Sequence, residues 1–243
     1  MNLDIHPGKV LKQLLILYCI LLCGNITGIV STFYFGHDFI YGLVPLFNFD
    51  TERSIPTFYS TLALVFSSVL LLFIALTSKQ HGKTSLYWLI LSVIFLFLSI
   101  DEMAGIHEKI DWSLSRVFNT TGLLYYVWVV PYGIAVMVFG IAYIRFLMIL
   151  PARTRNLFIV SGTVFVAGAI GIEALSGMYY ERYGHKNLIY SLLYTCEESF
   201  EMIGVIIFNY SLLAYVADQD KYLTINFIGR DRSNSHVSRG RDS

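Results

Sequence analysis

Residues 84–106 read TSLYWLILSVIFLFLSIDEMAGI, and the first seventeen of them carry no charged side chain. A helix needs about 20 apolar residues to cross about 30 Å of hydrocarbon, so this stretch predicts a transmembrane helix. Asp101 and Glu102 close the apolar run, and His107 and Glu108 follow soon after. The stretch therefore predicts a membrane fold and a place where ionisable groups meet the edge of the lipid.

The rest of the chain has the same character. Of its 243 residues, 56% are hydrophobic and 14% are charged, whereas soluble domains carry about 25% charged residues. We therefore expect an all-α integral membrane protein, a six-helix transmembrane bundle with short links. Its spans are predicted at residues 12–35, 57–78, 84–106, 123–150, 156–180 and 186–217.

Domain organisation follows from where the apolar blocks end. We expect residues 1–220 to form one six-span transmembrane domain, and residues 221–243, which are polar and basic, to form a disordered cytoplasmic tail. The first block follows two lysines as in a signal peptide, but it lacks a small-residue cleavage site, which favours a retained helix. The three cysteines lie inside apolar blocks, so no disulfide framework is expected.

The distribution of basic residues predicts the orientation, because cytoplasmic loops are enriched in lysine and arginine. Twelve of these residues fall on the side of both termini and five on the other side. Both termini are therefore predicted to be cytoplasmic, in a plasma or inner membrane. Twelve of the 17 acidic residues fall on the opposite, outer side.

The depth of the acidic residues can be counted at about 1.5 Å per helical residue. Counted from the inner helix ends, Asp101 and Glu173 lie at about 26 Å, Glu201 at about 23 Å and Glu198 at about 27 Å. Three helices thus place carboxylates in one layer near the outer interface. Intramembrane acids are costly and mark functional sites by default, although pairing with lysine or arginine is an alternative.

Carboxylates with a histidine suit divalent iron, manganese or zinc. Glu197, Glu198 and Glu201 share one face of the last helix because they are three and four residues apart. We predict a metal pocket in this layer. Its expected ligands are Asp101, His107, Glu173, Glu198 and Glu201, and its candidate catalytic residues are Glu102 and Glu197.

The segment around His107 allows other interpretations. Glu102 and His107 are five apart and do not share a face of a regular helix, but a bend at Gly105 would change that geometry. Residues 107–111, HEKID, resemble the His-Glu-x-x-His zinc motif with Asp111 in the last position. The alternative is that Glu108 and Asp111 are solvated loop charges.

A weak internal similarity links two outward-running spans. IDEMAG at 100–105 and IEALSG at 172–177 both read Ile, acid, any residue, Met or Leu, a small residue and Gly. The sequence leaves open whether the bundle is built from three repeated helix hairpins. If it is, the acids occupy equivalent positions, as in many transporter folds.

These observations favour a metal-dependent membrane enzyme, a hydrolase or an oxidoreductase, that acts on a lipid or lipophilic substrate. The alternatives are a cation or proton-coupled transporter, and an accessory subunit of a larger membrane complex. The chain has no phosphate-binding glycine loop and no basic aromatic patch, so we expect no nucleic-acid partner. The oligomeric state is left open.

Overall fold

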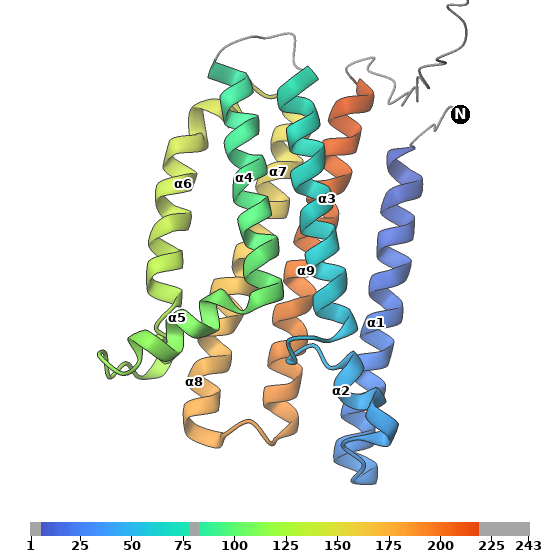
Figure 1. The fold of residues 1–243 in the computed structure, drawn as a ribbon, viewed down its shortest axis with the longest axis vertical. Helices are drawn as coiled ribbons and strands as arrows, with labels where there is room; N and C mark the ends of the chain where they lie inside the picture. Colours follow the sequence, from blue (N-terminus) through green and yellow to red (C-terminus); the bar gives the residue numbers. More distant parts are fainter. Residues whose placement is uncertain (1–5, 78–82, 219–243) are drawn as a thin grey trace, which may run out of the picture.

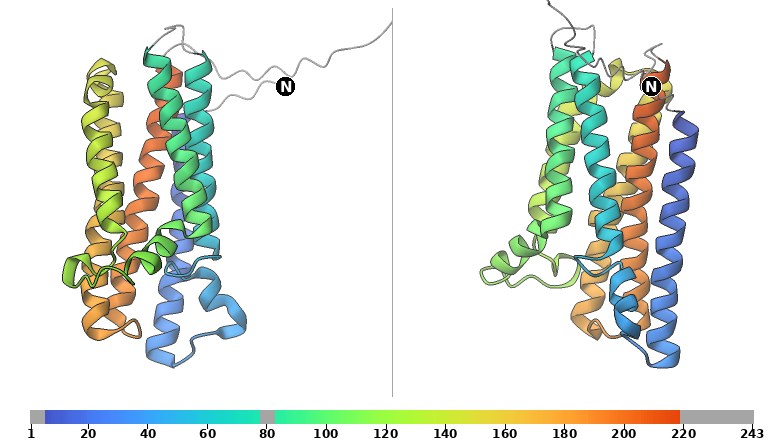
Figure 2. Two further views of the ribbon diagram at one scale, coloured as in Figure 1. Left: turned by 60° about the vertical axis from the view of Figure 1, so that its left-hand side comes forward. Right: turned by 45° about the vertical axis from the view of Figure 1, so that its right-hand side comes forward.

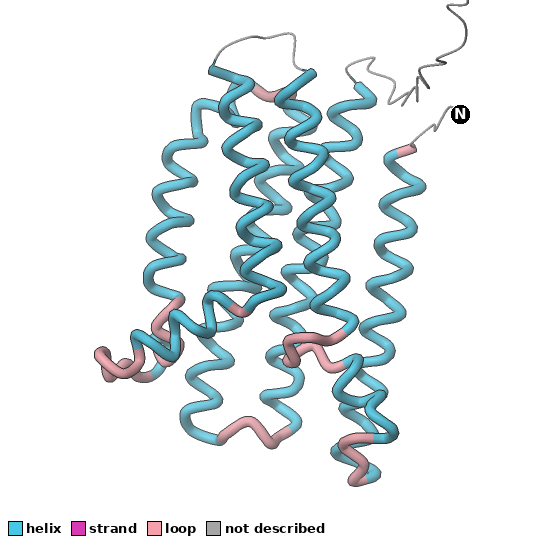
Figure 3. The backbone as a smooth tube through the Cα atoms, viewed as in Figure 1, coloured by secondary structure: helices cyan, strands magenta, loops and turns pink. Residues whose placement is uncertain are grey.

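The computed structural model describes residues 6–77 and 83–218, and the described part is helical without strands. Loops gather at the two ends of the helices (Figure 3). The predicted tail at 221–243 lies outside the described residues, as does Lys79, one of the basic residues counted on the side of the termini. The elements are α1 (Pro7–Phe35), η1 (Ile40–Gly42), α2 (Leu43–Phe47), α3 (Ile55–Thr77), α4 (Lys83–Ala104), α5 (Ile106–Leu114), η2 (Gly122–Leu124), α6 (Val129–Ile149), α7 (Ala152–Val166), η3 (Ala167–Ile172), α8 (Glu173–Tyr183) and α9 (Leu188–Asp218).

Among the described residues, six helices are long and apolar enough to cross a membrane, which confirms the six-span prediction. They are α1, α3, α4, α6, α9 and the continuous run of α7, η3 and α8. The two ends of the described chain lie at the same end of the bundle (Figure 1). Which side of the membrane that end faces stays a prediction, as does the threefold repeat.

Some predicted boundaries are wrong. The span expected over 84–106 ends at Ala104, because Gly105 adopts a left-handed φ of 54° and α5 then turns sideways (Figure 1). The span expected from residue 123 begins at Val129. The fifth span begins at Ala152 because Pro151, whose ring fixes φ, directly precedes it. By contrast with Gly105, the helix continues through Gly177, so the two similar segments differ in structure.

α9 lies in the middle of the bundle and contacts α1, α3, α7 and α8. Near the end that carries both termini, the core is aromatic, with Trp88 and Phe146 fully buried. At mid-depth, Asn209 donates a 3.0 Å hydrogen bond to the carbonyl of Ala63 and accepts one of 2.9 Å from Ser67. Such interhelical hydrogen bonds hold α3 against α9 where lipid gives no hydrophobic driving force.

The α7–α8 span contains a π-helical segment, η3, directly before Glu173. Here the helix is packed closely on α9, because a Cβ at Gly168 would overlap the backbone of Glu197. Such wide turns are rare in helices and are frequent at functional sites. The segment ends where the acidic residues of α8 and α9 begin to face one another.

Candidate metal centre

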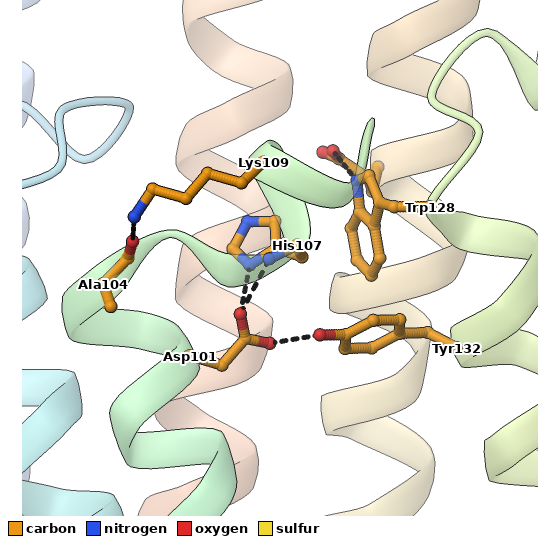
Figure 4. A network of polar contacts seen from close by, with 7 residues as sticks. Asp101, Ala104, His107, Lys109, Trp128 and Tyr132 are labelled. Carbon is orange, nitrogen blue, oxygen red and sulfur yellow. Dashed lines mark hydrogen bonds and ion pairs between the residues drawn. The ribbon is translucent and has the colours of Figure 1, made fainter. Parts of the chain in front are cut away.

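The break at Gly105 brings His107 back onto Asp101. Asp101 Oδ1 accepts hydrogen bonds from the backbone N–H of His107 at 2.8 Å and from its Nδ1 at 3.2 Å (Figure 4). Tyr132 donates from its hydroxyl to the other oxygen of Asp101 at 2.9 Å. The bend considered at Gly105 is thus present, but it brings His107 into hydrogen-bond contact with Asp101, whereas the sequence spacing had drawn attention to Glu102.

Asp101 fixes the orientation and the charge of the His107 ring. Burial alone would lower the pKa of His107, but the hydrogen bond to Asp101 and its negative charge outweigh burial and raise the pKa to about 9. With Nδ1 held by the carboxylate, Nε2 is the ring nitrogen that could bind a metal once it has lost its proton. This carboxylate–histidine pairing is the arrangement usually found around metal-binding histidines.

The loop between α2 and α3 contributes two further acids. Buried Asn25 positions this loop, because it accepts a hydrogen bond from the N–H of Phe49 at 3.1 Å and donates to Thr195 on α9 at 2.8 Å. Burial, opposed by a hydrogen bond from Tyr190 and reinforced by nearby acids, raises the pKa of Asp50 to about 7. The pKa of Glu52 is also raised, first by burial and then by the charge of Glu108.

Glu52 packs on the bare backbone of Gly105. A Cβ built at Gly105 would overlap the Glu52 carboxylate. Position 105 therefore requires glycine for two reasons: its φ is positive, and Glu52 occupies the space that a side chain would need.

This double requirement gives a testable prediction with a matched control. Gly105→Ala and Gly122→Ala both place alanine at a positive φ, which costs about 1–2 kcal/mol, but the space around Gly122 is open. We expect Gly105→Ala to lower the unfolding free energy in detergent by more than Gly122→Ala, because only the former displaces Glu52. Equal losses in the two variants would contradict the contact.

α8 and α9 present acids from the other side. Glu173 accepts a hydrogen bond from the indole N–H of Trp128 at 3.3 Å. The hydroxyl of Ser176 lies 3.3 Å from one oxygen of Glu173 and 3.2 Å from one of Glu197, so it bridges the two acids. Glu198 interacts electrostatically with acids of other elements, first of all with Glu102 on α4.

These elements enclose a cavity of about 350 Å³. Its lining contains eight carboxylic acids and one histidine, and no lysine or arginine among the described residues. The ionisable lining residues are Asp50, Glu52, Glu102, His107, Glu108, Asp111, Glu173, Glu197 and Glu198. Phe49, Trp112, Tyr126, Trp128, Tyr190 and Tyr194 form aromatic parts of its wall.

The acids of this cavity are not neutralised by basic side chains. Within residues 6–77 and 83–218, the only ion pairs are His107–Asp101 and, far from the cavity, Arg153–Asp218. Lys109 instead donates to the backbone carbonyl of Ala104 (Figure 4). Pairing of the cavity acids with a lysine or arginine, the alternative explanation for intramembrane acids, is thus not seen among the described residues.

One group in the cavity has distances suitable for a metal ion. Ligand atoms of Glu52, His107 and Glu108 all lie within 4.8 Å of one another. Two of these residues belong to the short helix α5 and the third to the loop before α3. Glu102, Glu173 and Glu198 line the same cavity, so further carboxylates surround this group.

The structure brings together most, but not all, of the residues predicted from the sequence. Five of the seven line the cavity, namely Glu102, His107, Glu173, Glu197 and Glu198. Asp101 is buried against His107 and Tyr132 instead. Glu201 does not appear in the lining, although it interacts electrostatically with Glu102 and Glu173.

Four lining acids were not among the predicted site residues. Asp50 and Glu52 lie on an irregular loop, where counting depth along a helix does not apply. Glu108 and Asp111 were interpreted as solvated charges in the alternative. Glu108 is exposed, as that alternative expects, although both residues line the cavity, and Asp111 also accepts a hydrogen bond from the N–H of Trp128 at 3.3 Å. The HEKID segment was the one available signal for these two acids.

Comparison with known families assigns the chain to a family, but the description of that family states no function. Residues 14–216 match the model of a family described as a domain of unknown function, DUF8692, and the chain belongs to this family. No curated protein and no solved structure matches the chain.

Proposed function

We propose that this member of the DUF8692 family is a divalent-metal-dependent membrane enzyme that acts on a lipid or lipophilic substrate. The observation that carries the proposal is the cavity lined by eight carboxylic acids and one histidine, without a lysine or arginine among the described residues. Ionised carboxylates crowded in a buried site are unfavourable unless a cation compensates them. A bound divalent cation supplies that compensation.

The donor set fits a transition metal or zinc. Glu52, His107 and Glu108 would hold the ion, since their ligand atoms already lie within 4.8 Å of one another. Glu102, Glu173 and Glu198 would complete or surround this set. Asp101 would orient His107 from behind. One imidazole among many carboxylates suits iron, manganese or zinc.

A metal held here would polarise a substrate oxygen and lower the pKa of a bound water. Any cavity carboxylate that is not a ligand would then be placed to accept a proton, and Glu102 and Glu197 are our candidates for this general base.

Several buried polar groups away from the cavity hold helices together. Asn209 bonds to Ser67 and Ala63, and Ser68 bonds to Ser92 at 2.8 Å, so these groups tie helices together. Ser60, Thr61 and Ser211 are buried hydroxyls of the described residues that have no hydrogen-bond partner, so a cation or proton-coupled transporter stays the alternative function. The basic residues on the side of the termini further support a cavity that opens to the outer face.

The metal content of the wild-type protein tests the proposal. We expect protein purified in detergent without chelator to contain about one or two equivalents of iron, manganese or zinc by mass spectrometry. Chelation should remove the metal and lower the melting temperature, and adding the metal back should restore it. Folded wild-type protein that neither contains nor takes up a divalent metal would overturn the proposal. Metal flux into vesicles would favour the transporter.

A further inference from the structure

α4 and α6 are joined by hydrogen bonds at two places along their length. At the end near the termini, Tyr143 donates to the carbonyl of Tyr87 at 3.0 Å, beside the buried Trp88–Phe146 contact. At the other end, Tyr132 donates to Asp101 at 2.9 Å. Along α4 these two attachments are fourteen residues apart, or about 21 Å.

Between the two attachments, apolar side chains of α4 and α6 are only partly covered by protein. Ile90 and Phe97 on α4 are 41% and 45% exposed, and Val136 on α6 is 37% exposed. Ala135 is exposed, and Ile94 and Phe139 are only half-buried. We call these six side chains the lateral window. α6 itself stands at the edge of the bundle (Figure 2).

The lateral window ends beside the candidate metal centre. Its outer end is the Tyr132–Asp101 hydrogen bond, and Asp101 also holds His107, a cavity residue. The ring of Trp128, another cavity residue, lies 5.0 Å from that of Tyr132 and 4.9 Å from that of His107. The Tyr132–Asp101 contact and the rings of Trp128 and His107 therefore lie between the apolar window and the polar cavity.

The position of α5 places the window at the depth of the hydrocarbon. α5 runs sideways from the outer end of α4 (Figure 1). Trp112 on α5 and Phe118 just after it are 61% and 54% exposed. Exposed aromatic side chains, tryptophan above all, are typical of the bilayer interface. The window begins directly next to the level of α5, on the side toward the middle of the bundle.

We propose that the lateral window binds the apolar chain of a membrane lipid, whose polar end passes the Tyr132–Asp101 contact into the carboxylate cavity. This inference rests on the proposed function and gives its substrate a route from the bilayer. The walls of the window between the two hydrogen bonds are wholly apolar, which suits a hydrocarbon chain and excludes a polar ligand.

A second copy of the protein fits the window less well than a lipid chain. A helix with its side chains is about 10 Å wide and would not enter between two helices that are joined by hydrogen bonds at both ends. A copy packed on the outward face of α6, at Val138 and Ile141, would leave the inner face uncovered. Only a thin, flexible chain can cover both facing walls.

Photolabelling in vesicles tests the proposal. The probe is a phosphatidylethanolamine that carries a diazirine in one acyl chain, and labelled peptides are mapped by mass spectrometry. We expect the window segments of α4 and α6 to be labelled several-fold more than α3 around Val69, which is 56% exposed. Val136→Trp should fill the window and remove this excess. Val138→Trp, the same change on the outward face of the same helix, should leave it intact.

The same preparations separate this inference from the proposed function. Loss of the excess label in Val136→Trp with unchanged metal content supports the window. Equal labelling of α3, α4 and α6, or equal labelling of the two tryptophan variants, overturns it whatever the metal content. If wild-type protein shows the excess label but no metal, the proposed enzyme function fails while the lipid site stands. Ala135→Phe is the second filling variant, should Val136→Trp lower the melting temperature.

Discussion

Replacing Glu102 and Glu198 together by glutamine is expected to lower the affinity for the divalent metal by at least about 100-fold, since even indirect changes around a metal site cost 10- to 100-fold. The two residues come from α4 and α9 and line the same cavity. Neither carboxylate forms a hydrogen bond within the described part of the chain. The substitutions would therefore break no hydrogen bond of the protein, and their effect would be on metal binding. Titration of metal-free protein against a competing metal indicator would measure it.

The stability of the metal-free protein gives this prediction a second readout. Glutamine keeps the size of glutamate but removes two negative charges from a crowded acidic cavity. The metal-free double variant should therefore melt at the same or a higher temperature than the metal-free wild type, although it binds metal poorly. The control is Asp38→Asn with Asp218→Asn, which removes the same charge outside the cavity. If both double variants weaken binding equally, a local metal site is contradicted.

Asp101→Asn is expected to weaken metal binding by about 10- to 100-fold without removing any residue from the cavity wall. Asp101 now accepts from Nδ1 of His107 and leaves Nε2 to bind. An asparagine amide can donate to Nδ1 instead, which places the ring proton on Nε2 and blocks that nitrogen. The measurement is the same indicator titration, together with nitrogen NMR of the histidine tautomer.

Tyr132→Phe is the control for Asp101→Asn. It removes the hydroxyl that donates to the other oxygen of Asp101 but leaves the contacts with His107 in place. We expect metal affinity to change by less than about 10-fold, below the range for loss of an orienting partner. A loss as large as that of Asp101→Asn would show that Asp101 acts through the packing of α6 and not through His107.

The sequence allows the helices and the depth of their acids to be predicted, because the rise of a helix per residue is fixed. Glu102, Glu173 and Glu198 come from three different spans. They line one cavity because they lie at similar depth along their helices. Asp50 and Glu52 could not be placed by counting. Their loop is held by Asn25 and Tyr190, which are distant in sequence, so their position depends on tertiary contacts.

The lateral window was beyond sequence reasoning for a different reason. In a soluble helix, polar residues mark the exposed face, but a helix in lipid can be apolar on every side. Val136 and Val138 are the same residue type on opposite sides of α6, and their exposures of 37% and 61% follow from where the neighbouring helices end up. Only the packed structure distinguishes the two positions.

The π-helical segment before Glu173 sets the rotational phase of the second half of its span. A wide turn accommodates one more residue than an α-helical turn, and each residue advances the helix by about 100°. α7 can therefore pack on α9 in one rotational setting while α8 turns Glu173 and Ser176 toward Glu197 in another. A straight α-helix of the same sequence could satisfy the packing of α7 or the orientation of Glu173, but not both.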